Sequence, residues 1–276
     1  MNHTDSLKFS ILMSIYYKEK PEFFDRCMVS IWNEQSIKPS EIVLVQDGKL
    51  TNELYLVINK WQKVIGELFK IVDLKENVGT GKAKNIGLKY CKYQIIAIMD
   101  TDDIAQSKRF EKQLKILNKG FDVCSSWVSE FVDNEENIIS FRKVPEYHYE
   151  IIDFAKSRMP VNHPSTMYKK DIAIQSGGYK HMLWFEDYYL MVRMIQNGAK
   201  FYNIQEPLVS MRIGYEQLER RRGLKYAIAE LKFFNELKRR KFINNIDFIK
   251  NIAIRLIIRI SPRFVTKAVY KLLRKG

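Results

Sequence analysis

The sequence is poor in the residues that build disulfide frameworks and zinc sites. Only three cysteines occur in 276 residues, at Cys27, Cys91 and Cys124, and none pairs with another in a CxxC motif. Their scarcity excludes a disulfide framework and a cysteine-ligated zinc ion, and it favours a reducing compartment. No apolar run reaches the roughly 18 residues of a membrane-spanning helix, and the first residues do not resemble a signal peptide. We therefore expect a cytoplasmic protein.

Acidic residues are scarce in the last fifth of the chain. Residues 219–276 contain 17 Lys and Arg but only 4 Asp and Glu, which gives this segment a formal charge of +13. Residues 1–218 contain 29 basic and 28 acidic residues, a balance of +1. With 46% hydrophobic and 28% charged residues, the composition is that of a globular protein and not of a disordered one. The sequence thus predicts a nearly neutral globular part and a basic tail.

Strand and helix patterns alternate through the first hundred residues. Near-continuous apolar runs predict strands at 8–17, 41–48, 69–74 and 94–100. Helical spacing of apolar residues predicts helices at 21–35, 51–61 and 79–90, with Thr51 as a cap. This alternation is typical of an α/β fold with a mainly parallel sheet that helices cover on both faces. Such sheets bind ligands beyond the carboxyl ends of their strands.

The pattern is less regular in the second half. Residues 121–144 indicate two strands joined by an acidic turn, and 159–171 indicate a loop that leads into a short strand. A helix is predicted from Glu186 to Asn197, where Gly198 ends it.

Polar side chains follow three of the predicted strands. They are Tyr16 to Glu19 after the first strand, Asp47 after the second, and Asp100 to Asp103 after the fourth. Because the carboxyl ends of parallel strands meet at one edge of a sheet, we expect these groups to converge on one crevice.

The last of these groups places three carboxylates within four positions. Alternation along an extended chain puts Asp100 and Asp102 on one side, where they suit a ribose hydroxyl and a hard cation such as Mg2+ or Mn2+. Alternatively, Asp102 or Asp103 simply caps the helix that contains Phe110. His163 is a candidate metal or phosphate contact, and the alternative is a buried structural histidine.

The segment NVGTGKAKNIG lacks the third glycine of a dinucleotide-binding fingerprint and the upstream glycine of a P-loop. A glycine turn that leads into a helix with Lys82 and Lys84 suits a phosphate, but the lysines alone also suit a solvated helix face.

Glu186 and Asp187 begin a predicted helix, where carboxylates are favourable for the helix dipole. A second interpretation is a general base, because Trp184 and Phe185 form an apolar wall that raises a carboxylate pKa. Arg193, about two turns further on, is then a candidate to orient one member of the pair.

These pieces occur in an order that resembles the family 2 inverting glycosyltransferases with the GT-A fold. Within that family they are similar to bacterial exopolysaccharide, capsule and O-antigen enzymes, including the amylovoran biosynthesis type. The resemblance covers residues 8–215 and rests on ILMSIYYKE, PSEIVLVQDG, ENVGTGKAKNIGL, IAIMDTDD and WFEDYYLMVRM. It implies a Rossmann-like catalytic domain at 1–215, with a nucleotide-binding half at 1–103 and an acceptor-binding half at 104–215. Residues 216–276 then form a basic helical extension.

The resemblance also implies a role for each matching residue. Asp100 and Asp102 form its DxD element, and Asp187, beside Glu186, is the base. The metal candidates, for Mn2+ or Mg2+, are Asp102, Asp103 and His163. The nucleotide-sugar site comprises Ser14, Tyr16, Glu19, Asp47, Lys84, Asn85, Asp100, Thr101 and Asp102. The sequence departs from the family at Ser14 and Tyr17, where proline and asparagine are usual, and at Lys84, where arginine is frequent.

The implied reaction moves a hexose or N-acetylhexosamine from a UDP-sugar to a hydroxyl of an undecaprenyl-diphosphate-linked saccharide. One alternative is a sugar-nucleotide nucleotidyltransferase, which needs a basic glycine-rich loop after the first strand, where SIYYKEK stands. The other is a non-catalytic, membrane-bound protein that binds nucleotide sugars.

The basic tail carries two periodic stripes. One is polar and consists of Asn244, Asp247, Asn251, Arg255 and Arg259; the other consists of Arg263, Lys267 and Lys271 opposite apolar residues. Basic amphipathic helices lie in anionic membrane interfaces, so we expect peripheral attachment to the inner face of the bacterial cytoplasmic membrane. No nucleic-acid-binding motif accompanies the charge. Residues 216–241 equally suit a helix that packs on the catalytic domain.

Overall fold

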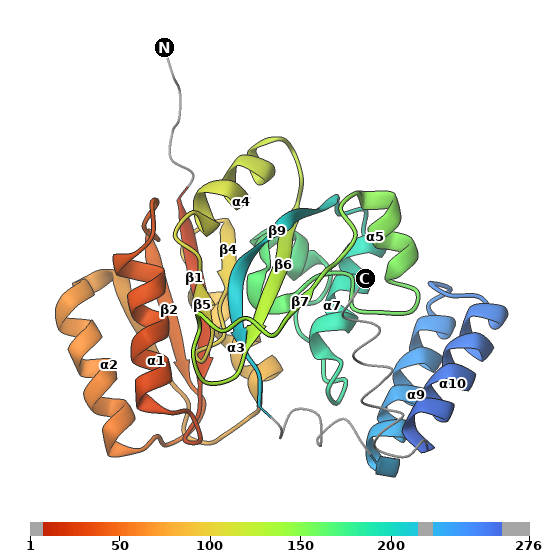
Figure 1. The fold of residues 1–276 in the computed structure, drawn as a ribbon, viewed down its shortest axis with the longest axis horizontal. Coiled ribbons are helices and arrows are strands. Elements are labelled where there is room, and N and C mark those ends of the chain that lie inside the picture. The colour runs from red at the N-terminus through yellow and green to blue at the C-terminus, as the bar shows by residue number, and fades with distance from the viewer. Residues whose placement is uncertain (1–7, 215–222, 261–276) are drawn as a thin grey trace.

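The computed structural model describes residues 8–214 and 223–260, with side chains up to residue 255. The stripe from Arg263 to Lys271 lies outside these residues. Within them the chain forms one mixed sheet flanked by helices, with a pair of C-terminal helices at one end (Figure 1). The predicted α/β class with a mainly parallel sheet is confirmed.

The first half of the sheet is entirely parallel. Its strands lie in the order β3-β2-β1-β4. Their bounds are β1 Phe9–Ile15, β2 Glu41–Gln46, β3 Phe69–Asp73 and β4 Ile95–Ile98. Every residue of β2 and β4 is buried, because helices cover both faces. The four strands predicted from apolar runs are therefore confirmed, and their carboxyl ends share one edge.

The second half of the sheet is mixed. β8 (Met167–Lys169) runs antiparallel between β4 and β6 (Val123–Phe131), and β6 then pairs in parallel with β9 (Phe201–Arg212). The two-residue strand β5 (Ile104–Ala105) lies along β9, and β7 (Ser140–Arg142) forms the predicted hairpin with β6.

Helices divide the core between the two faces of the sheet (Figure 1). Ile11 of β1 packs on the first face, whereas its neighbour Leu12 packs on the second, as the alternation of a strand requires. The first face is covered by α1 (Pro21–Met28), α2 (Asn52–Ile65) and α4 (Arg109–Asn118). The second face is covered by α3 (Thr80–Tyr90), α5 (His148–Phe154), α6 (Lys170–Gln175) and α7 (Glu186–Gln196).

The start of α2 and the end of α1 can be compared with the predicted helix boundaries. Thr51 caps α2, since its hydroxyl accepts a hydrogen bond from the Leu54 backbone N–H at 3.3 Å. The helix predicted to run to residue 35 changes character after Met28 and continues as a π-helical segment, Val29–Asn33.

The C-terminal pair consists of α9 (Gly223–Arg239) and α10 (Asn245–Ile260). The Phe233 ring of α9 stacks on Phe185 with the centroids 4.7 Å apart and also contacts Tyr188 of α7. These side chains form a third core with Phe234 and Leu237, so α9 is packed directly on the helix that carries Glu186 and Asp187.

The polar stripe of α10 faces the protein. Asn251 is buried and donates to the Lys156 carbonyl at 3.0 Å, and Arg255 pairs with Glu230 of α9 at 3.0 Å. Part of the apolar surface of α10 points outward, with Ile246 75% and Ile249 65% exposed, whereas Phe248 and Ile252 pack on the third core. Among the described residues, none of the helices combines the length and the apolar character that crossing a bilayer requires.

Candidate active site

Asp47 fastens the glycine turn to the end of β2. Its two carboxylate oxygens accept the backbone N–H groups of Val78 at 2.7 Å and Gly79 at 3.0 Å. Gly79 has a φ of +86°, a conformation that favours glycine, and α3 begins at the next residue. The turn thus directs the first residues of α3 toward the carboxyl edge of the sheet, where Lys82 is exposed and Lys84 is buried.

The three aspartates after β4 have three different environments. Asp100 accepts an ion-paired hydrogen bond from Lys84 Nζ at 3.0 Å. Asp103 is buried and accepts the Arg212 backbone N–H at 2.9 Å. Asp102 is only partly buried, and no other described residue forms a hydrogen bond or ion pair with its carboxylate. The helix α4 begins at Arg109, so the alternative in which Asp102 or Asp103 caps this helix is wrong.

Negative charge is crowded in the segment Asp100–Asp103, which we call the aspartate turn. Burial, together with the nearby carboxylates of Glu19 and Asp100, raises the pKa of Asp102 to about 7. Burial also raises the pKa of Asp103 well above its ordinary value, with Asp102 as the next cause. A bound cation would offset this crowding.

The donor set fits a hard cation that takes part of its ligands from a substrate. In the described ranges, no three or more His, Cys, Asp or Glu side chains come together as a complete metal cage. Mg2+ is commonly bound by one or two carboxylates together with substrate phosphates, and Asp102 offers such a carboxylate.

Glu19 and Thr101 join the end of β1 to the aspartate turn. The Thr101 hydroxyl donates to Glu19, which also accepts the Lys20 backbone N–H at 2.8 Å. Burial raises the pKa of Glu19. Tyr16 is 38% exposed at the same strand end, and Ser14 lies half-buried within β1.

A chain of contacts leads from Asp100 to Asp187. Lys84 Nζ lies 3.5 Å from His163 Nδ1, and His163 Nε2 lies 3.2 Å from Asp187 Oδ1 and 3.2 Å from the Tyr179 hydroxyl. Burial lowers the pKa of Lys84, but the nearby Asp100 and Asp187 raise it above its ordinary value. Burial lowers the pKa of His163. Both ring nitrogens of His163 thus face protein groups, and neither contacts Asp102 or Asp103.

The first residues of α7 lie close to the first turn of α3. A Cβ atom on Gly81 would lie 3.0 Å from Glu186 Cγ, which shows how closely the two helix starts approach. Burial raises the pKa of Glu186, as expected from the apolar wall. Phe185 is buried, whereas Trp184 is 40% exposed, has a φ of +65° and stacks on Tyr226 at 5.1 Å.

Two other side chains hold the loop before α7. Arg193 donates to the backbone carbonyls of Ser176 and Gly178, so the expectation that it orients Glu186 or Asp187 is wrong. Asn85 accepts the Tyr179 backbone N–H at 3.1 Å, which ties this loop to α3.

Sequence reasoning missed Arg212. Its guanidinium lies 3.8 Å above the Phe23 ring, and its Nε donates to the Asp102 carbonyl at 3.3 Å. Arg212 ends β9, a strand that was not predicted because Pro207 interrupts it. The pairing with β6 shifts register at this proline, in the manner of a β-bulge.

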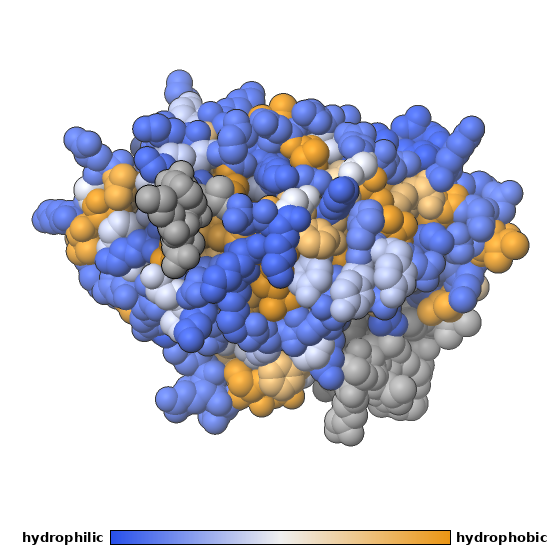
Figure 2. Space-filling model, turned by 90° about the horizontal axis from the view of Figure 1, so that it is seen from above, coloured by the Kyte–Doolittle hydropathy of each residue, from blue (hydrophilic) through white to orange (hydrophobic). Residues whose placement is uncertain are grey.

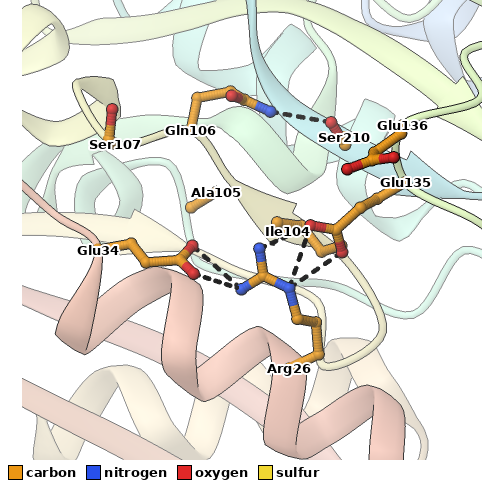
Figure 3. Close-up of a pocket in the computed structure, with 9 residues that line it drawn as sticks. All are labelled: Arg26, Glu34, Ile104, Ala105, Gln106, Ser107, Glu135, Glu136 and Ser210. Atoms are coloured by element: carbon orange, nitrogen blue, oxygen red, sulfur yellow. Dashed lines mark hydrogen bonds and ion pairs between the residues drawn. The ribbon is translucent and has the colours of Figure 1, made fainter.

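A cavity of about 410 Å³ opens beside β5 (Figure 3). Arg26 lies between Glu34 at 3.0 Å and Glu135 at 2.7 Å, and Gln106 donates to Ser210. None of the predicted site residues lines this cavity.

A mainly parallel sheet that gathers carboxylates at its carboxyl edge has the architecture of a GT-A glycosyltransferase. The chain belongs to glycosyl transferase family 2, whose family model matches residues 10–176. The match includes the aspartate turn, Lys84 and His163, and it ends before Asp187.

Two relatives match nearly the whole chain. The UDP-Gal:alpha-D-GlcNAc-diphosphoundecaprenol beta-1,3-galactosyltransferase of Escherichia coli is 38% identical over 97% of this chain and 96% of that protein. The amylovoran biosynthesis glycosyltransferase AmsE of Erwinia amylovora is 34% identical over 97% of this chain and its entire length. The crystal structure of S. aureus TarS 1-349 in complex with UDP-GlcNAc aligns with a TM-score of 0.66 and 15% identity, over 91% of this chain and 72% of that one. The protein is therefore a glycosyltransferase.

Proposed function

We propose that the protein is an inverting, cation-dependent glycosyltransferase that uses a UDP-sugar. The donated group is a hexose or an N-acetylhexosamine, and the acceptor is a hydroxyl of an undecaprenyl-diphosphate-linked saccharide. The observation that carries this proposal is the chain of contacts that runs from Asp100 through Lys84 and His163 to Asp187. It joins a carboxylate in the turn after β4 to a carboxylate on α7. The name of the Escherichia coli relative, which shares 38% identity, supports the nucleotide and the acceptor.

On the donor side, we assign the uracil and ribose to the sheet edge formed by the ends of β1 and β2 and the glycine turn. Tyr16 and Glu19 follow β1 at this edge, Asp47 follows β2, and Asp100 follows β4. Asp102 would hold Mn2+ or Mg2+ together with the diphosphate oxygens. A cation bound there acts as a Lewis acid on the departing diphosphate. Asp103 stabilises the aspartate turn, because its carboxylate accepts the Arg212 backbone N–H.

On the acceptor side, we assign Asp187 as the general base. Its side chain is 39% exposed, so an acceptor hydroxyl can reach it. The carboxylate removes the hydroxyl proton, and the oxygen attacks the anomeric carbon from the face opposite the nucleotide. One displacement with a single base inverts the anomeric configuration.

The test is the substitution Asp187→Asn. An amide cannot accept the proton, so we expect sugar transfer to fall by at least about 100-fold while UDP binding stays near the wild-type value. UDP release with a synthetic lipid-diphosphate acceptor and Mn2+ measures transfer, and calorimetry measures binding. Wild-type turnover by this variant would remove Asp187 from the mechanism. UDP binding by the wild type without any transfer would favour a non-catalytic binding protein.

We also infer that the C-terminal helices lie on an anionic membrane surface. Figure 2 shows a mostly hydrophilic surface on which apolar side chains form separate patches. Exposed apolar side chains lie on both α9 and α10, at Leu224, Ile228, Leu231, Ile246, Ile249 and Ile254. Exposed lysines lie on the same two helices, at Lys225, Lys232, Lys238 and Lys250. Exposed apolar side chains interspersed with lysine suit an interface of acyl chains and anionic headgroups, where a lipid-linked acceptor is found.

A further inference from the structure

His163 occupies a position that neither of its predicted roles explains. It lies in the short 3-10 turn His163–Ser165 and is only 7% exposed. Both of its ring nitrogens contact functional groups, Lys84 on one side and Asp187 on the other. A cation ligand needs a free nitrogen lone pair that faces open space, and a purely structural histidine needs no contact with the base.

The neighbouring lysine determines which ring nitrogen carries the proton. Lys84 Nζ is an ammonium group with donors only, and it lies 3.5 Å from Nδ1. Nδ1 must therefore present its lone pair, and the proton of the neutral ring is on Nε2. Nε2 forms a hydrogen bond with the Tyr179 hydroxyl at 3.2 Å and also lies 3.2 Å from the charged Asp187 Oδ1, in a close contact that is not aligned as a hydrogen bond.

We propose that His163 is a positioning residue that holds the Asp187 carboxylate through the electrostatic contact between its Nε2–H dipole and Oδ1. This contact leaves Oδ2 of Asp187 to accept the proton of the acceptor hydroxyl. Lys84, which is fixed by its ion pair with Asp100, selects the imidazole tautomer that places the proton on Nε2. The inference rests on the proposed role of Asp187 as the base.

The surrounding contacts make this arrangement rigid. Lys84 and Asn85 are neighbours on α3; one contacts His163, and the other binds the Tyr179 backbone N–H. The Tyr179 hydroxyl lies 3.2 Å from His163 Nε2 and 3.4 Å from the Tyr168 hydroxyl. The groups that face the imidazole thus come from three segments, and α3 connects them to Asp100. One helix therefore sets the distance between the donor-side carboxylate and the base.

Two substitutions of His163 distinguish positioning from a structural role. Glutamine places an amide N–H near the position of Nε2, whereas asparagine reaches only to the position of Nδ1 and leaves Asp187 without this contact. We expect H163N to lower kcat about 100-fold, the scale of a misplaced catalytic group, and H163Q to recover most of that loss. The KM for the UDP-sugar should change by less than about threefold in both variants.

His148 provides the matched control. Its Nδ1 accepts the Phe201 backbone N–H at 3.2 Å, a bond that the side-chain oxygen of asparagine can replace. It lies at the start of α5, so H148N should keep the wild-type kcat. Circular dichroism and UDP affinity would show whether each variant is folded.

Three outcomes would overturn the proposal. They are wild-type kcat in H163N, equal losses in H163N and H163Q, and loss of UDP binding in folded H163N, which would place His163 on the donor side. Each leaves the proposed function standing as long as Asp187→Asn abolishes transfer. Full transfer by Asp187→Asn would instead refute the base assignment itself.

Discussion

At the scale of single residues, the aspartate turn shows that identical side chains have different roles. Lys84 forms an ion pair with Asp100, the Arg212 backbone N–H binds Asp103, and we propose that Asp102 binds an external cation. The sequence shows three carboxylates in four positions and predicts that they belong to a site. It cannot rank them, because each partner lies at least 16 positions away along the chain.

The difference between Asp102 and Asp103 can be measured. We expect Asp102→Ala to raise the Mn2+ concentration needed for half-maximal UDP binding by about 10- to 100-fold, with little change in stability. Asp103→Ala should instead lower the free energy of unfolding by about 1–3 kcal/mol, because it removes the carboxylate that accepts the partly buried Arg212 N–H. Calorimetric Mn2+ titrations and urea unfolding report the two effects. A reversed pattern would assign the cation to Asp103.

At the scale of elements, the sequence predicts best where helices and strands are regular. The four parallel strands are mostly apolar, so their pattern predicts them well. The strand β9 was missed because Pro207 removes a backbone donor at the bulge, and β5 was missed because it has only two residues. Arg212 was missed along with β9. The burial of Lys84 was not predictable, since a helix pattern alone does not show which lysine is buried.

Helix α3 packs so closely on the sheet that only glycine fits at position 87. A Cβ atom on Gly87 would lie 2.5 Å from Val45 Cγ2 and 2.6 Å from Leu12 Cδ1. Alanine favours a helix by about 1 kcal/mol over glycine, but overpacking a core costs typically about 1–3 kcal/mol.

We therefore expect Gly87→Ala to lower the free energy of unfolding by up to about 2 kcal/mol, as measured by urea denaturation. The exposed Lys89 of the same helix supplies the control, and Lys89→Ala should stay within about 0.5 kcal/mol of the wild type. A Gly87→Ala variant more stable than the wild type would show that α3 has room to move off the sheet.

At the scale of the whole molecule, charge and apolar surface coincide at one end of the chain. The composition predicts the basic tail and its membrane partner, and the periodic polar residues of α10 are visible in the sequence. The sequence does not predict that this stripe faces the protein. Its orientation depends on Glu230 and the Lys156 carbonyl, which α10 contacts only in the folded chain.

Vesicle binding tests the membrane surface. We expect the full chain to sediment with phosphatidylglycerol vesicles at low salt, and to bind phosphatidylcholine vesicles weakly. The double variant Ile246→Ser and Ile249→Ser should bind several-fold less, by about the transfer free energy of two exposed isoleucines.

The matched control removes two exposed apolar side chains from α2, through Leu56→Ser and Val64→Ser, and it should bind as the wild type does. Equal binding by both double variants would contradict the assignment of this face. Failure of the full chain to bind anionic vesicles at all would reject the membrane partner.

The stack of Phe233 on Phe185 also bears on where this protein can be shortened. A fragment that ends at Gly214 keeps every residue of the predicted site, yet it uncovers Phe185 and Tyr188 immediately beside Asp187. Helix α9 thus covers the apolar residues that flank Asp187. We therefore expect a minimal active enzyme to include α9.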